Sequence, residues 1–154
     1  MKNIIIITLI VICSVVKADT KTFIKALIMT ESSGRSYVTG DNGKAVGCLQ
    51  IHPCVVKDVN RIYKTHYKLS DRKNIKKSIE MCIKYLKHYG AHYTKKTGLR
   101  PTHQVYSRIW NGGVYGWKNK ATEKYWDKVK YHIAKINTYN VLKTKKYMVC
   151  FNML

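Results

Sequence analysis

Apolar residues recur at intervals of three and four along most of this chain, and glycine-containing turns separate one such stretch from the next. This spacing places the apolar side chains on one face of an α-helix, so it favours a mainly helical fold. The predicted faces are Ile24, Leu27, Ile28 and Glu31; Val55, Val56, Val59, Ile62 and Tyr63; Ile75, Ile79, Cys82, Ile83 and Leu86; Val105 and Ile109; and Tyr125, Trp126, Val129, Ile133 and Ile136. The sequence therefore predicts a single, mainly α domain.

Residues that favour helix ends flank these stretches. Pro53 suits the first turn of the second helix, and Ser32-Ser33-Gly34 ends the first. Gly90 and Gly98 bracket the fraying end of the third helix. The expected N-terminal caps are Asn74, Thr102 and Thr122.

Other segments lack a helical pattern. Residues 37–47 carry three glycines and predict a loop or an irregular hairpin, and Asn111-Gly112-Gly113 stops the fourth helix. After Asn137 the helical signal weakens, and Tyr147–Phe151 has a strand-like composition. We therefore treat residues 137–154 as a C-terminal extension that follows a domain over residues 19–136.

The N-terminus is typical of a secretory signal peptide. Lys2 precedes an apolar run from Ile4 to Val16, and short residues before Asp19 offer a cleavage site. We expect residues 1–18 to be removed and the protein to be secreted or periplasmic. The alternative is an N-terminal anchor that stays uncleaved.

The chain is strongly basic, with 29 Lys and Arg against 8 Asp and Glu and a formal charge of +21. Loss of Lys2 and Lys17 with the signal segment lowers this charge to +19. Such a charge attracts anionic polymers. The candidates are nucleic acid, anionic lipid and cell-wall polymers, and export favours the last. The alternative is a solvated basic surface without a partner.

Four cysteines follow the signal segment: Cys48, Cys54, Cys82 and Cys150. An exported chain could join them in two disulfides with three possible pairings, whereas Cys48 and Cys82 lie in apolar runs and could be buried thiols. His52 and Cys54 are close in sequence, but the histidines form no closed ligand set. We expect no metal.

Glu31 is a carboxylate on an apolar helix face. Loss of hydration raises the pKa of a carboxyl group, so this side chain could stay protonated and act as a general acid. The alternative is a helix-end glutamate that reaches water or pairs with Arg35. Farther along, Gln50 lies among apolar residues, and Trp110, Tyr115 and Trp117 surround Asn111. Aromatic faces beside amides and a protonated carboxyl suit the binding and cleavage of sugar chains.

The order and spacing of five motifs resemble the soluble lytic transglycosylase and goose-type lysozyme superfamily. The motifs are "ESSG", "GCLQIHP", "DRKNIKKSIEMCIKYLKHYG", "IWNGG" and "TEKYWDKV", and the resemblance covers most of residues 23–135. It implies a lysozyme-like fold and cleavage of the β-1,4 bond between N-acetylmuramic acid and N-acetylglucosamine in peptidoglycan. It implies no metal and no organic cofactor, and we expect a monomer.

The resemblance also assigns roles to residues. Glu31 matches the catalytic acid, Gln50 and Asn111 match residues lining the glycan cleft, and Tyr125 matches a tyrosine near the acid. Ser32 matches the residue after the acid that shapes the substrate site. Trp110 replaces a tyrosine of the family and keeps a stacking face for the substrate.

Asp41 is a possible second carboxylate. The segment "GDNGKAVG" resembles a loop of goose-type lysozymes that carries an aspartate. The alternative, which we favour, is that Asp41 is only a turn former that satisfies its own backbone. His52 stands where those lysozymes have a further acidic residue. This departure favours a transglycosylase with one glutamate over a hydrolase. The alternative function is a non-catalytic, cationic wall-binding or antimicrobial protein on the same scaffold, which would have no reason to keep Glu31.

Overall fold

The computed structural model describes the backbone of residues 20–151 and the side chains of residues 20–143. The expected signal segment, residues 1–18, lies outside the described residues, so its cleavage and the domain boundary beside it stay predictions. Within residues 20–151, no helix combines the length and the apolar character that crossing a bilayer requires.

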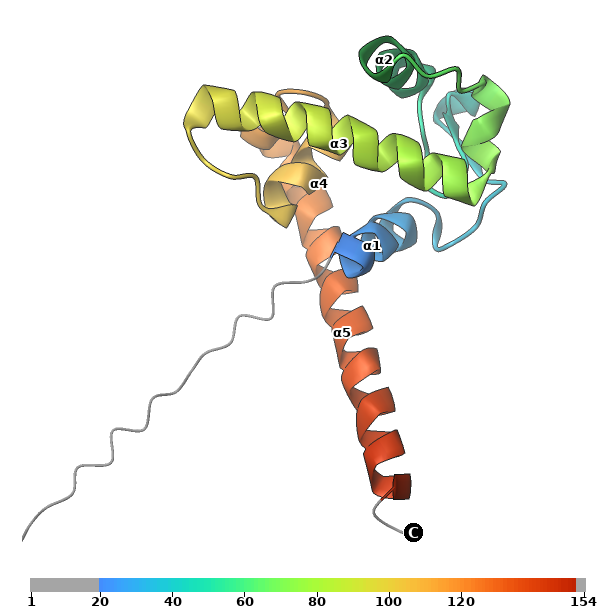
Figure 1. Cartoon of the computed structure of the whole chain (residues 1–154), viewed down its shortest axis with the longest axis vertical. Helices are drawn as coiled ribbons and strands as arrows, with labels where there is room; N and C mark the ends of the chain where they lie inside the picture. Colours follow the sequence, from blue (N-terminus) through green and yellow to red (C-terminus); the bar gives the residue numbers. More distant parts are fainter. Residues whose placement is uncertain (1–19, 152–154) are drawn as a thin grey trace, which may run out of the picture.

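The described chain is mainly helical and forms one body, as the apolar spacing predicts (Figure 1). The α-helices of residues 20–151 are α1 (Thr20–Ser32), α2 (Pro53–Tyr63), α3 (Ile75–Thr97), α4 (His103–Gly112) and α5 (Glu123–Phe151). The 3-10 helices are η1 (Asp41–Gly43), η2 (Leu69–Lys73), η3 (Gly116–Lys118) and η4 (Lys120–Thr122). A two-stranded antiparallel hairpin joins β1 (Thr39–Gly40) to β2 (Ala45–Val46), so the irregular hairpin predicted for residues 37–47 is confirmed.

The core forms where α1 packs against α5 and where α3 packs against α2 and α4. Fully buried side chains come from every one of these helices and from the segment after β2. They include Leu27, Leu49, Ile51, Val59, Met81, Cys82, Ile109 and Val129. At the C-terminal end of α1, the Ser32 hydroxyl lies 2.9 Å from the Cys48 carbonyl, so this end is tied to the segment after β2.

Most predicted helix ends are confirmed. Pro53 begins α2, the Asn74 side chain accepts a hydrogen bond from the Lys77 N–H at 3.1 Å, and Gly98 ends α3 in the left-handed conformation. Thr102 likewise accepts from the Val105 N–H at 3.3 Å. These contacts satisfy backbone groups that a helix end leaves unpaired.

Thr122 precedes α5 as expected, but its side chain does not cap that helix. It is buried and accepts a hydrogen bond from Arg108 Nε at 2.9 Å. Its hydroxyl lies 2.8 Å from the Gly116 carbonyl and 2.7 Å from the Asn119 carbonyl, and it donates to one of them. Thr122 therefore anchors the η3–η4 turn beneath α4. The prediction of the helix start was correct, and the predicted contact was wrong.

The predicted face of α3 is partly wrong. Ile75 and Ile83 are exposed, whereas Ser78 and Tyr85 are buried. Gly90 does not mark a fraying end either, because a Cβ atom there would lie 2.6 Å from Tyr106 Cε1. The helix continues past Gly90 because the missing side chain lets α4 approach closely.

The strand-like composition of Tyr147–Phe151 does not produce a strand, because α5 continues as a helix through Phe151. Strand propensity depends on a neighbouring strand to pair with, and the hairpin is the only sheet in the described residues. Figure 1 shows that this end of α5 projects beyond α1 and away from the rest of the molecule.

The thiols of Cys48, Cys54 and Cys82 are free. Cys48 and Cys82 are buried, whereas Cys54 is exposed. The two core cysteines are therefore buried thiols and not partners in a disulfide. The Cys150 side chain lies outside the described residues.

Candidate functional site

Glu31 occupies the last turn of α1 and faces a cleft between the hairpin and α4. Its side chain is half-buried, and Tyr125 of α5 donates a hydrogen bond from its hydroxyl to Glu31 Oε1 at 2.6 Å. The close packing of α1 against α5 brings these residues together across 94 positions of sequence. The carboxyl group is thus held in one orientation.

Burial raises the pKa of Glu31 above its ordinary value, since the apolar surroundings disfavour the charged form. Hydrogen bonding from Tyr125 and Trp110 lowers the pKa, the negative charge of Asp41 raises it, and the positive charge of Lys128 lowers it. The net result is a raised pKa. A carboxyl in this state keeps its proton at a pH where an exposed glutamate is ionised.

Arg35 is not the partner of Glu31. Its Nε instead donates a hydrogen bond to the Ser32 carbonyl at 3.0 Å. The alternative of a helix-end glutamate paired with Arg35 is therefore wrong, because Arg35 is used to close the end of α1.

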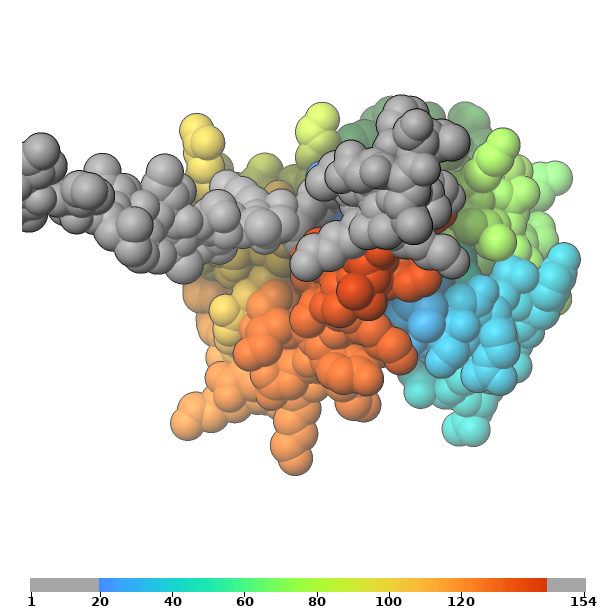
Figure 2. All heavy atoms as spheres, turned by 90° about the horizontal axis from the view of Figure 1, so that it is seen from below, coloured from blue at the N-terminus to red at the C-terminus, as the bar shows by residue number. Residues whose placement is uncertain are grey.

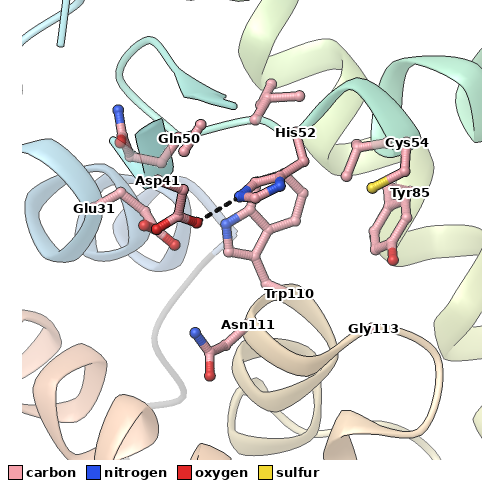
Figure 3. A pocket seen from close by; sticks show the side chains of 12 residues that line it. Glu31, Asp41, Gln50, His52, Cys54, Tyr85, Trp110, Asn111 and Gly113 are labelled. Atoms are coloured by element: carbon pink, nitrogen blue, oxygen red, sulfur yellow. Dashed lines mark hydrogen bonds and ion pairs between the residues drawn. The ribbon is translucent and has the colours of Figure 1, made fainter. Parts of the chain in front are cut away.

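The cleft encloses about 470 Å³ and brings together residues from four separate segments. Among the residues expected at the site, its walls include Glu31, Asp41, Gln50, Trp110 and Asn111. Figure 3 shows the side chains of Glu31, Asp41 and Trp110 converging on this space. Its mixture of carboxyl, amide and aromatic groups suits a sugar polymer, which offers hydroxyl groups and apolar ring faces.

Asp41 forms an ion pair with His52, whose Nε2 lies 2.9 Å from Asp41 Oδ2 (Figure 3). The Asp41 side chain is 68% exposed and stands at the hairpin tip, where Asp41 and Asn42 both have left-handed backbone angles. Asp41 is thus a turn residue that also faces the cleft. His52 immediately precedes Pro53 at the start of α2, which fixes the position of the imidazole.

The side-chain amide of Gln50 is hydrogen-bonded to the hairpin segment. Its Nε2 donates to the carbonyls of Val38 at 3.1 Å and Gly47 at 2.9 Å. A Cβ atom on Gly40 would lie only 2.6 Å from Gln50 Oε1, so glycine at this position makes room for the amide. Gln50 lines the cleft while holding its shape.

Trp110 and Asn111 lie on the last turn of α4. Trp110 is half-buried with its ring edge-on to Tyr85, the centroids 5.7 Å apart, and Asn111 is exposed on the cleft wall. Tyr115 and Trp117 are not among the cleft-lining residues. Lys118 Nζ lies 4.6 Å from the Tyr115 ring centre, and Trp117 packs edge-on against Tyr93.

Ser32 lies beneath the cleft and not on its wall. It is buried, and its hydroxyl lies 2.9 Å from the Cys48 carbonyl and 3.2 Å from the Ile28 carbonyl. The expected contact of Ser32 with substrate is therefore wrong, because this side chain points inward to tie α1 to the segment after β2. Its role is to hold the turn that presents Glu31.

Arg72 is a site residue that the sequence patterns did not reveal. Its NH1 donates to the carbonyls of Lys44 at 2.8 Å and Ile51 at 2.9 Å, and it is buried. Gly47 lies so close to Arg72 that a Cβ atom would collide with the Arg72 carbonyl oxygen. The guanidinium thus clamps Lys44, in the hairpin turn that carries Asp41, to Ile51, the residue before His52. In a chain with so many basic residues, no local pattern distinguishes a buried arginine.

Among the residues that the structure describes, no group of three or more His, Cys, Asp or Glu is arranged to hold a metal ion. The chemistry available in the cleft is that of Glu31 with Tyr125 and of the Asp41–His52 pair.

Comparison with known proteins agrees with this arrangement. The family model described as the transglycosylase SLT domain matches residues 14–131. A search of the curated proteins finds no match to the chain. The matched range includes all five motifs and every cleft residue discussed above, and it confirms the expected lysozyme-like domain. The chain belongs to the SLT transglycosylase domain family, whose members are lytic transglycosylases acting on peptidoglycan.

Proposed function

We propose that Glu31 is the acid and base of an exported lytic transglycosylase that cleaves the β-1,4 bond between N-acetylmuramic acid and N-acetylglucosamine. The observation that carries this proposal is the half-buried Glu31 carboxyl in the cleft, fixed by Tyr125 at 2.6 Å and with a raised pKa. A general acid works best when its pKa lies near the working pH.

The reaction needs two proton transfers at one group. Glu31 first donates its proton to the glycosidic oxygen as the bond from that oxygen to C1 of N-acetylmuramic acid breaks. The Glu31 carboxylate then accepts the proton of the C6 hydroxyl of the same sugar, whose oxygen bonds to C1. The product has a 1,6-anhydro end, Glu31 is protonated again, and no water is consumed.

Tyr125 supports both steps, because a hydroxyl donor stabilises the carboxylate that exists between them. Trp110 provides an apolar face for a sugar ring, and Asn111 provides an amide at the cleft wall. Both amide hydrogens of Gln50 are used by the hairpin, so its Oε1 is the atom assigned to sugar recognition.

The Asp41–His52 pair supports the transglycosylase product over hydrolysis. An inverting hydrolase needs a second carboxylate that holds a water at roughly 6.5–9.5 Å from the acid. Here His52 occupies Asp41 Oδ2 at 2.9 Å, and no further acidic residue lines the cleft among the described residues. We infer that Asp41 orients the hairpin tip and tunes Glu31, and that Glu31 acts alone.

Export follows from the substrate and from residues 1–18, whose sequence is typical of a signal peptide. We propose a secreted or periplasmic monomer that holds glycan strands in the cleft. Its net charge would draw it to anionic wall polymers. It requires no cofactor.

The test is mass analysis of the fragments released from purified peptidoglycan by the wild-type protein, Glu31→Gln and Asp41→Asn. Anhydro ends are one water lighter than reducing ends. Glu31→Gln should lose activity by at least about 10²–10⁴-fold, since glutamine keeps the shape but has no transferable proton. Glu123→Gln is the matched control, because that glutamate is exposed at the start of α5.

Asp41→Asn should keep anhydro products. Reducing ends that disappear in Asp41→Asn would overturn the transglycosylase assignment and establish a hydrolase. Wall binding without cleavage by the folded wild-type protein would favour the non-catalytic, cationic alternative.

A further inference from the structure

A second surface lies where α1 packs against the outer half of α5. Three adjoining hollows open there, and they share walls: Tyr131 and His132 each line two of them, as do Lys135 and Tyr139. One of them, of about 410 Å³, runs between α1 and α5. We name the α1–α5 face by its exposed members, which are Lys25, Met29, Tyr131, Lys135, Tyr139 and Leu142. In Figure 2 the orange and red part of α5 faces the viewer with the blue α1 beside it.

Large apolar side chains on this face are open to solvent. Tyr131 is 61% exposed, Tyr139 is 65% exposed and Leu142 is 61% exposed. They recur at intervals of eight and three along α5, so they lie on one side of the helix. Exposed apolar surface that is gathered in this way, and not scattered, indicates a binding surface.

The same part of the chain is purely basic. Residues 128–154 contain six lysines and no aspartate or glutamate. Among the described residues that line the three hollows, Asp127 is the one carboxylate, and it lies at the end nearest the body of the molecule. A partner of this face must therefore supply negative charge as well as an apolar region.

A second copy of the chain fits poorly, because it would bring Lys25, Lys135 and their counterparts together without acidic partners. A soluble anionic polymer would satisfy the lysines but leave Tyr139 and Leu142 in water. An anionic lipid leaflet supplies both requirements, since phosphate head groups lie above acyl chains. A helix with aromatic and aliphatic residues on one side and lysines beside them is typical of helices that lie in this interface. Tyrosine in particular favours it, because its ring is apolar and its hydroxyl is polar.

We propose that the α1–α5 face binds the surface of an anionic lipid leaflet, with Tyr139 and Leu142 inserted and Lys25 and Lys135 at the head groups. No described residue lines both this face and the Glu31 cleft, so lipid binding and glycan cleavage use separate surfaces. The enzyme would work on wall strands beside a membrane while resting on it.

The test is cosedimentation of the full chain with vesicles of phosphatidylcholine, with or without phosphatidylglycerol. Tyr139→Ser/Leu142→Ser removes the apolar contacts, and Leu99→Ser is the matched control because Leu99 is 61% exposed beyond the end of α3. Residues 1–19 are the same in all three proteins, so any binding through that segment cancels in the comparison. We expect the double variant to bind anionic vesicles at least about tenfold more weakly and the control to bind like wild type.

A second pair of variants tests the charge. Lys25→Gln/Lys135→Gln should weaken binding to anionic vesicles, whereas Lys95→Gln/Lys96→Gln, at the far end of α3, should weaken it less. Equal binding by the wild type and the Tyr139/Leu142 variant would overturn the proposal, as would equal affinity for neutral and anionic vesicles. A wild-type dimer in sedimentation velocity that this variant dissolves, without vesicle binding, would overturn it in favour of self-association. Cleavage of soluble glycan fragments should be unchanged in all four variants, which separates this test from that of Glu31.

Discussion

Replacing Glu31 with glutamine is expected to stabilise the folded protein at neutral pH while it removes activity. The wild-type carboxyl is half-buried, and burial raises its pKa above the ordinary value of 4.5 that it regains on unfolding. Between that value and the folded-state pKa, the folded protein binds more protons than the unfolded chain. The free energy of unfolding therefore falls as the pH rises through this window. Glutamine resembles the protonated carboxyl at every pH and has no such loss.

The difference in the free energy of unfolding between Glu31→Gln and the wild type depends on two opposing contributions at Glu31. Ionisation in the cleft costs hydration, whereas the 2.6 Å bond from Tyr125 favours the carboxylate. A hydrogen bond to a charged group contributes about 1.5–3 kcal/mol against about 0.5–1.5 kcal/mol for a neutral one. Glutamine keeps the bond but loses roughly 1 kcal/mol of charge assistance. Because desolvation outweighs the hydrogen bonds, the glutamine variant should be the more stable at pH 7. Single substitutions that stabilise a protein commonly add about 0.5–2 kcal/mol, and we expect a gain within this range.

Urea unfolding of the wild type and Glu31→Gln between pH 4 and pH 8 measures this effect. The stability difference should be near zero at pH 4, grow with pH and level off above the folded-state pKa. On melting, each kcal/mol corresponds to about 2–4 °C in a domain of this size. Glu123→Gln should show no stability gain that grows with pH, because it removes an ion pair with Arg108 at 3.8 Å. A Glu31→Gln protein that is less stable than the wild type at pH 7, or a stability difference that does not vary with pH, would show that burial does not disfavour the charged form of Glu31.

Three further outcomes are expected. Tyr125→Phe removes the donor that lowers the pKa of Glu31, so the alkaline limit of the pH–activity profile should move upward, and an unchanged limit would contradict the contact seen here. Pelleting with purified walls should weaken steeply between low and high salt, because exposed charges are screened within about 10 Å at 0.1 M salt, whereas cleavage of short neutral oligosaccharides should change less. Arg72→Met should lower the free energy of unfolding by about 2–4 kcal/mol in urea, because it leaves the Lys44 and Ile51 carbonyls without their buried donor; a loss below about 0.5 kcal/mol would contradict the clamp.

Much of the fold could be predicted from short-range patterns. Asn74 and Thr102 cap helices through contacts with residues three positions away, and Pro53 and Gly98 act through their own backbone angles. Such preferences need only the neighbouring sequence, so they survive in any tertiary context that allows a helix. The prediction for Gly90 of α3 was wrong because a neighbouring helix determines the residue at that position. Glycine is needed there because Tyr106 of α4 approaches closely, which the sequence around Gly90 does not reveal.

The same distinction between local and long-range contacts applies to the candidate site. The amino-acid pattern was enough to place Glu31 on an apolar helix face, and the motif order identified the family. The side chains that meet this carboxyl depend on the packing of distant segments: Tyr125 bonds to it from 94 positions away, His52 pairs with Asp41, and Ser32 points inward. Helical periodicity fixes the direction of a side chain relative to its own helix, but its partners depend on how separate elements pack. The polar contacts of this cleft therefore exist only once α1, α5 and the hairpin are in place.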